Sequence, residues 1–191
     1  MSFSTFKPSK NDNISLGVTM SIKFFALIAT AAITLTACQK ANTCTYNAES
    51  SELVCVEKSY KTVNTGNHIW MAENLARLDL TGTSHCYGDS ARNCEIYGSL
   101  YPYETATKIC PEGWTLPTQA DFENADFNVL NVAKAGFRYY DGKSADMGAS
   151  ASFWTADNFD ESRAVLVRVT DSVVYEHFNK SISASLRCIK K

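Results

Sequence analysis

The sequence contains no apolar run long enough to cross a membrane, and it has no excess of positive charge. Its longest uncharged and mostly apolar stretch, Phe24–Ala37, is shorter than the roughly 20 residues that a membrane-spanning helix needs. The formal net charge is -2, whereas a nucleic-acid-binding domain is expected to carry a clustered basic face. Hydrophobic residues make up 45% of the chain, which is enough to form a buried core. We therefore expect a single globular domain that does not bind nucleic acid.

The sequence also lacks the residue spacings of common metal and catalytic sites. No Cys-x-x-Cys pair occurs, and His68, His85 and His177 stand apart without ligand spacing. Adjacent carboxylates such as Asp160 and Glu161 occur, but any acidic surface carries such pairs. We therefore expect a non-catalytic protein without a cysteine–histidine metal site.

Residues 1–37 have the pattern of an export signal. A short basic segment, Met20–Lys23, precedes the apolar stretch, which ends in Leu35-Thr36-Ala37-Cys38 and so matches the lipobox of bacterial lipoproteins. In that pattern the Cys38 thiol accepts a diacylglyceryl group. The alternative is an ordinary signal peptide with Cys38 in a disulfide, but Leu35 would then stand where a small residue is preferred. We predict that the signal peptide lies within residues 1–37, that translation starts at Met20, and that residues 1–19 are a start-site error.

The export signal predicts a location in the cell envelope. A lipid on Cys38 would anchor the protein to a membrane, because two or three acyl chains suffice for stable attachment. Gln39, rather than Asp, follows the lipidated cysteine, which favours the outer membrane or cell surface. This is an oxidising environment, in which cysteines form disulfides.

Six cysteines remain once Cys38 carries lipid, and their even number favours structural disulfides over a free catalytic thiolate. Sequence alone leaves many pairings open. Proximity favours Cys44–Cys55 and Cys86–Cys94, which leaves Cys110–Cys188 as the third pair.

Turn residues and hydrophobic patterning divide the mature chain into short elements. Residues 38–58 are expected to hold the lipidated N-terminus, a tether and a disulfide hairpin, and residues 59–191 the folded domain. Thr118 is a suitable N-cap for an amphipathic helix over Gln119–Leu130. A long loop is expected from Asp141 to Ser162. The expected strands are Cys44–Tyr46, Leu53–Glu57, Ser59–Val63, His68–Met71, and a C-terminal antiparallel meander of Ala164–Val169, Val173–Phe178 and Ser183–Ile189.

An ordered series of short motifs between Ser59 and Lys191 resembles the Fibrobacter succinogenes major paralogous domain, a family of secreted and surface proteins with no settled activity. The segment between the helix at Asp121 and Gly136 is shorter than this resemblance implies. The motifs are Tyr60–Val63, Gly66-Asn67, Trp70–Leu75, Cys86-Tyr87, Asn93-Cys94, Tyr97–Tyr101, Cys110–Thr118, Gly136–Arg138, Asp141-Gly142, Phe153–Thr155 and Leu186–Lys190.

A more distant resemblance bears on the fold. The segment Trp114–Phe122 is similar to the helix start of formylglycine-generating-type domains, which have a C-type-lectin-like fold. A cysteine near this helix paired with one at the C-terminus would also resemble the long bridge of lectin-like domains. The resemblance implies a disulfide-stapled α+β domain with irregular antiparallel strands and one or two helices. Oxidase activity is not expected, because it needs a reactive copper-binding cysteine pair and each of the six cysteines other than Cys38 has a plausible disulfide partner.

Aromatic residues in the expected loops are candidate ligand-binding residues, because exposed flat rings stack on sugars. We name Tyr139, Tyr140 and Trp154. Because Tyr139 and Tyr140 are adjacent, one of the two would face outward in a strand. The alternative is that most aromatic side chains pack in the core, as the family resemblance implies for Trp70, Trp114 and Trp154.

Calcium is the candidate cofactor, because carboxylates of the expected long loop could supply oxygen ligands. The candidate ligands are Asp141, Asp157, Asp160 and Glu161. The alternative is a solvated acidic loop, and the segment has none of the Glu-Pro-Asn, Gln-Pro-Asp or Trp-Asn-Asp signatures of sugar-binding lectins.

These observations lead to two functional hypotheses. The first is a non-catalytic surface lipoprotein whose domain is a binding or adhesion module for an extracellular ligand such as a polysaccharide. The second is a structural or assembly protein of the outer envelope that contacts other proteins. An exposed group of aromatic side chains would favour the first hypothesis, and a broad apolar patch would favour the second.

Overall fold

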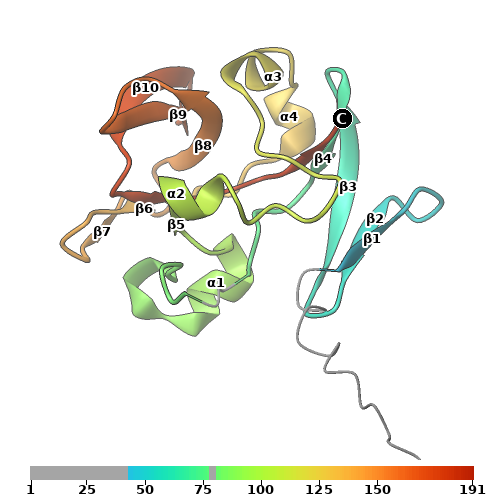
Figure 1. Ribbon diagram of the computed structural model, residues 1–191, viewed down its shortest axis with the longest axis horizontal. Helices are drawn as coiled ribbons and strands as arrows, with labels where there is room; N and C mark the ends of the chain where they lie inside the picture. Colours follow the sequence, from blue (N-terminus) through green and yellow to red (C-terminus); the bar gives the residue numbers. More distant parts are fainter. Residues whose placement is uncertain (1–42, 78–80) are drawn as a thin grey trace, which may run out of the picture. The chain divides into compact units, whose positions relative to one another are not determined.

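The computed structural model describes residues 43–77 and 81–191, which include the predicted domain 59–191 except for residues 78–80. The predicted signal peptide, the start site at Met20, the lipidation of Cys38 and the beginning of the tether lie outside the described residues. The described chain combines antiparallel sheets with short helices and three disulfides, so the predicted disulfide-stapled α+β class is confirmed (Figure 1). None of the helices in this part of the chain is long and apolar enough to cross a membrane.

The first sheet holds the N-terminal strands and the last strand of the chain. Its five strands follow the order β1-β2-β3-β4-β12, and both predicted N-terminal hairpins are confirmed. Gly66, in the β3–β4 turn, has a φ of 57°, and a Cβ there would meet the Asn124 carbonyl oxygen at 2.8 Å, so only glycine fits. The strands are β1 (Cys44–Asn47), β2 (Glu52–Cys55), β3 (Ser59–Thr65), β4 (His68–Met71) and β12 (Ile189–Lys190).

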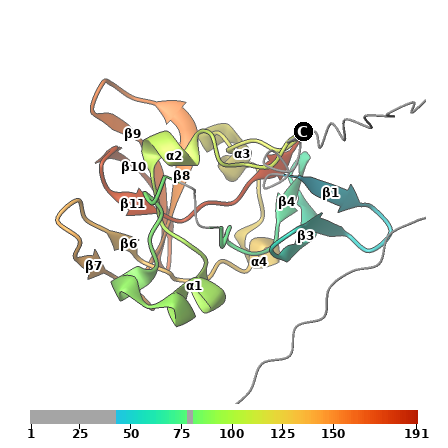
Figure 2. The same ribbon diagram turned by 60° about the horizontal axis from the view of Figure 1, so that its bottom comes forward.

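The other two sheets come from the second half of the chain. One has the order β10-β9-β8 and the other the order β5-β11-β6-β7. Figures 1 and 2 show the β6–β7 hairpin beside the segment that holds α1. The strands of the first are β8 (Ala151–Asn158), β9 (Arg163–Val169) and β10 (Val173–Asn179), and those of the second are β5 (Tyr101–Pro102), β6 (Phe137–Arg138), β7 (Ser144–Ala145) and β11 (Ser183–Ala184).

All the described helices are short. The predicted N-cap is confirmed: the Thr118 side chain accepts a hydrogen bond from the Asp121 amide, and the Asp121 carboxylate accepts one from the Thr118 amide. The helices are η2 (Tyr87–Asp89), α1 (Ala91–Tyr97), α2 (Tyr103–Ala106), α3 (Gln119–Glu123) and α4 (Phe127–Leu130).

The prediction of one continuous helix over Gln119–Leu130 is wrong, because the chain breaks between α3 and α4. The Asp126 side chain accepts a hydrogen bond from the Asn128 amide and thereby caps a new helix. The Asp126 amide donates to the Thr65 hydroxyl of β3. Asp and Asn side chains compete in this way with regular helical hydrogen bonds.

The prediction of a long loop from Asp141 to Ser162 is also wrong. This segment contains β7 and the eight-residue strand β8, whose first five residues are all buried. Because both faces of β8 are covered, the strand shows no alternation of apolar and polar residues from which it could be recognised.

The predicted C-terminal meander is correct for two of its strands only. β9 and β10 pair antiparallel as expected. The third expected strand, Ser183–Ile189, does not join them, because β8 occupies the free edge of β9. The chain instead leaves that sheet after β10, and its last residues form β11 and β12 in the other two sheets.

We call residues Ile182–Ile189 the C-terminal segment, and every residue in it is buried. Ser183 pairs with Pro102 and Arg138 in the third sheet, whereas Ile189 pairs with Trp70 in the first. Between them, Ser185 forms an isolated bridge with Phe153 of β8. The segment therefore connects all three sheets, and Figure 1 shows it crossing the domain in red.

The three disulfides are the predicted ones: Cys44–Cys55, Cys86–Cys94 and Cys110–Cys188. The first closes the β1–β2 hairpin, and the second closes the loop that contains η2 and the start of α1. The third spans 78 positions and attaches the C-terminal segment to the chain that precedes α3.

We expect the Cys110→Ala/Cys188→Ala double variant to lose about 4 kcal/mol of unfolding free energy, because this bridge closes the longest loop. Urea denaturation of the full-length protein in detergent measures the loss. The Cys44→Ala/Cys55→Ala variant is the matched control, with an expected loss of about 3 kcal/mol, since its loop is much shorter. A larger loss in the control would show that the long bridge is not the dominant constraint.

Candidate functional site

The candidate binding surface is the β6–β7 hairpin with its turn, Phe137–Ala145, which we call the tyrosine hairpin. Both predicted tyrosines lie in it and both are exposed, Tyr139 by 42% and Tyr140 by 81%. The Tyr139 ring packs edge-on against Phe137, with 4.8 Å between ring centroids. Tyr140 is the more outward of the two rings, so it presents most of its surface to solvent.

The turn of the tyrosine hairpin is fixed by its own hydrogen bonds. The Tyr139 amide donates to the Lys143 carbonyl at 2.8 Å, and the Gly142 amide donates to the Tyr139 carbonyl at 3.1 Å. Gly142 has a φ of 89°, which side chains other than glycine rarely adopt. The Lys143 amide donates to the Asp141 carboxylate and, with the Lys143 side chain, holds the pKa of Asp141 below its ordinary value.

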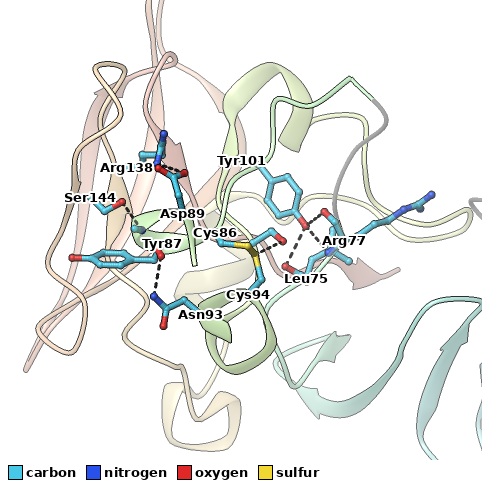
Figure 3. Close-up of a disulfide and its surroundings, with 12 residues drawn as sticks. Leu75, Arg77, Cys86, Tyr87, Asp89, Asn93, Cys94, Tyr101, Arg138 and Ser144 are labelled. Atoms are coloured by element: carbon cyan, nitrogen blue, oxygen red, sulfur yellow. Dashed lines mark hydrogen bonds and ion pairs between the residues drawn. A yellow bond between two sulfur atoms is a disulfide. The ribbon is translucent and has the colours of Figure 1, made fainter. Parts of the chain in front are cut away.

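The tyrosine hairpin is attached to the Cys86–Cys94 loop, as Figure 3 shows. Arg138 forms an ion pair with Asp89 of η2, with 2.8 Å between Nη1 and Oδ1. The Gly88 amide donates to the Ser144 hydroxyl at 3.1 Å. The two contacts hold opposite strands of the hairpin, so they restrict its position relative to the disulfide loop.

Two further contacts stabilise the Cys86–Cys94 loop itself. The Asn93 side-chain amide donates to the Tyr87 carbonyl at 2.9 Å, and the Cys94 sulfur lies 3.3 Å from the Ser99 hydroxyl. The loop therefore supports the tyrosine hairpin as a rigid element whose geometry depends on the covalent link.

Tyr101 attaches strand β5 to the chain that follows β4. Its hydroxyl donates to the Arg77 carbonyl at 2.6 Å, lies 3.2 Å from the Leu75 carbonyl oxygen, and accepts from the Arg77 amide (Figure 3). Burial raises the pKa of Tyr101, so the hydroxyl keeps its proton and remains a donor. The Tyr101 carbonyl also accepts from Trp154 Nε1 at 2.8 Å.

The prediction that Trp154 contacts a ligand is wrong. Its side chain has 0% exposure, and its ring packs against Tyr103 with 5.2 Å between centroids. A ring in this position cannot stack on an external ligand, and its indole N–H is already used in the core. Trp70 and Trp114 are also buried, as predicted.

The prediction of a shared calcium site is also wrong. Asp141 lies in the tyrosine hairpin, whereas Asp157 is the next-to-last residue of β8 and Asp160 and Glu161 lie in the turn before β9. Asp157 accepts a hydrogen bond from the Gln119 amide at the start of α3. Asp160 pairs with Arg163, whose hydrogen bond lowers the pKa of that carboxyl to about 2. Across the described residues, no group of three or more His, Cys, Asp or Glu side chains could hold a metal ion.

The structure brings together residues that the sequence gave no reason to combine. Arg138 and Asp89 are separated by 49 positions, and no periodicity links them. A second aromatic group was also not predicted: Phe159 stacks on His177 with 3.6 Å between centroids, and the Arg163 guanidinium lies 4.8 Å from the Phe159 ring. This group combines the Arg163 cation with two rings. Phe159 lies in the turn between β8 and β9, outside the tyrosine hairpin.

Comparison with known proteins supports the resemblance found in the sequence. The family model of the Fibrobacter succinogenes major domain matches residues 63–126, so this segment of the chain is similar to that family. The matched range includes the Cys86–Cys94 loop but ends before the tyrosine hairpin. No curated protein and no solved structure matches the chain.

Replacing Arg138 with Met should loosen the tyrosine hairpin, because it removes the ion pair to Asp89 and keeps the aliphatic stem. An ion pair with one exposed partner, here Asp89, contributes about 1 kcal/mol, so we expect roughly fivefold faster hydrogen exchange at the Gly142 amide. Lys143→Met is the control, since it removes only the ion pair at the turn. Unchanged exchange in Arg138→Met would contradict a supporting role for the disulfide loop.

Proposed function

We propose that the chain is a non-catalytic lipoprotein of the cell envelope whose domain binds an extracellular polysaccharide through the tyrosine hairpin. The observation that carries this proposal is the 81% exposure of Tyr140 on a turn that is fixed by hydrogen bonds, an ion pair and a nearby disulfide. A ring held in this way can stack on a sugar face without losing much conformational freedom.

The surroundings of Tyr140 support the binding of a ligand whose contacting surface is neutral or weakly acidic. Lys143 lies in the same turn and pairs with Asp141 at 3.1 Å, so the two charges offset each other beside the ring. Tyr139 adds a second, partly packed ring next to it. This combination offers apolar area with a few polar groups at its edge, which is how sugar-binding surfaces are built.

We also infer a divergent C-type-lectin-like fold for the domain. Two features support this inference: the long Cys110–Cys188 bridge, and the antiparallel sheet of β8, β9 and β10 that follows the helices. Fold likeness says little about the ligand, so the proposal of polysaccharide binding depends on the tyrosine hairpin alone.

The lipid anchor on Cys38 is part of the same proposal and has a separate test. Cys38→Ser should release the protein from membranes into the soluble envelope fraction, because lipidation requires the thiol. Fractionation of cells that produce the full-length chain measures this, with Cys44→Ser/Cys55→Ser as the control that removes two other cysteines but keeps the anchor. Membrane retention of Cys38→Ser would contradict lipid anchoring.

Polysaccharide binding is tested by co-sedimentation of the full-length protein, in detergent, with insoluble cellulose, xylan, chitin and peptidoglycan. We expect retention on at least one polymer and a roughly threefold to tenfold loss of affinity in Tyr140→Ala, the amount that one aromatic contact contributes. Phe159→Ala is the matched control, because it removes an exposed ring from another turn. EDTA should have no effect.

Either of two results would contradict this proposal. Retention that Tyr140→Ala and Phe159→Ala reduce equally would mean that the tyrosine hairpin is not the site. Retention on none of the polymers would favour the second hypothesis, in which the domain contacts other envelope proteins.

A further inference from the structure

A cleft of about 220 Å³ lies between the chain after β4, the end of α1 and the chain after α4. No residue of the tyrosine hairpin lines it. Its wall includes Asn74, Gly98 and Asn131, and its charged lining residues are Lys58, Glu73, Glu95 and Arg187. The volume is below the roughly 300–1,000 Å³ of sites for drug-sized molecules, so the cleft fits a small ligand.

Arg187 is the unusual member of this lining. It is only 1% exposed, yet no carboxylate among the described residues lies within ion-pair distance of it. Its Nε donates to Asn74 Oδ1 at 2.9 Å, and its Nη1 donates to the Leu130 carbonyl at 2.6 Å. The guanidinium carbon also lies 5.7 Å from the centroid of the Phe153 ring.

The guanidinium is charged and firmly held. Burial lowers the pKa of Arg187 to about 10, and the charge of Glu73 opposes that shift, so the group carries its proton at neutral pH. Asn74, which orients Nε, donates in turn to the Tyr97 carbonyl at 2.8 Å. The position of Arg187 is therefore fixed before any ligand arrives.

A buried cation without an anionic partner is costly, and a carboxylate brought in by a ligand would remove that cost. The guanidinium has five N–H donors, of which the contacts to Asn74 and Leu130 use two. The planar donors that remain suit a carboxylate, which accepts two parallel hydrogen bonds.

The charged residues at the rim of the cleft determine which second charged group a ligand can carry. Lys58 and Glu73 form an ion pair at 2.9 Å; the hydrogen bond and charge of Lys58 outweigh the effect of burial and hold the pKa of Glu73 below its ordinary value. Glu95 is exposed on α1 and has no ion-pair partner among the described residues. The charges left for a ligand are thus the Arg187 cation inside and the Glu95 anion at the rim.

We propose that this cleft binds a small zwitterion of the α-amino acid class, with its carboxylate on Arg187 and its ammonium group toward Glu95. A simple anion would gain the contact to Arg187 but would be repelled by Glu95. A simple cation would find no acceptor beyond the rim. The site is separate from the tyrosine hairpin and does not depend on polysaccharide binding.

Isothermal titration calorimetry of the full-length protein in detergent tests this proposal with glycine, alanine and glutamate as probes. We expect at least one of them to bind, and its amide derivative, which lacks the α-carboxylate, to bind at least tenfold more weakly. Propionate, which lacks the ammonium group, should also bind at least tenfold more weakly than alanine if alanine is the ligand.

Variants separate binding from folding. Glu95→Lys changes an exposed residue near the C-terminal end of α1, where a lysine is well tolerated. It should weaken amino acid binding at least tenfold and strengthen propionate binding. Arg187→Met should abolish both, and Glu112→Gln, an exposed carboxylate outside the cleft, should change neither. The absence of binding by all three amino acids, or an unchanged preference in Glu95→Lys, would overturn the proposal.

Discussion

The burial of the C-terminal segment is the constraint on which the rest of the structure depends. The Trp154 amide donates to the Ser185 carbonyl and the Ser185 amide to the Ser152 carbonyl, which attaches the segment to β8. The Met71 amide donates to the Cys188 carbonyl, which attaches it to β4. Each sheet is too small to bury its own apolar face, so the three share a buried core of two clusters, and this segment contributes side chains to both. The Cys110–Cys188 bridge makes one end of that arrangement covalent.

Both proposed binding sites take their geometry from the same segment. Ser183 of β11 pairs with Arg138 of β6, and Arg138 in turn reaches Asp89, so the tyrosine hairpin is positioned from the C-terminal segment and from the disulfide loop. Arg187 lies within the segment itself, and its hydrogen bond to Asn74 spans 113 positions. Function at either site therefore depends on contacts between residues that are far apart in the sequence, and it should be lost when the segment detaches.

Local chemistry in the sequence predicted a good part of this fold. The Thr118 cap, the two N-terminal hairpins and the β9–β10 pair follow from signals within a few residues, and the disulfides follow from proximity once two short loops are closed. The strand β8 was missed because burial on both faces removes its alternation, and Trp154 was misplaced with it. Tyr139 and Tyr140 were chosen as candidates because they lie beside an expected loop and are adjacent, but the tyrosine hairpin that holds them was not predicted. Its supports, and the unpaired charge of Arg187, are long-range features that no local pattern encodes.

The most direct test of this account is a peptide map of the protein isolated from cells and digested without reduction. The account predicts a peptide in which Cys110 is linked to Cys188, together with separate links within the β1–β2 hairpin and the η2–α1 loop. That result would establish that the C-terminal segment is held as described. Linkage of Cys110 or Cys188 to Cys86 or Cys94 would place the segment elsewhere, and it would contradict the shared core, the support of the tyrosine hairpin and the position of Arg187.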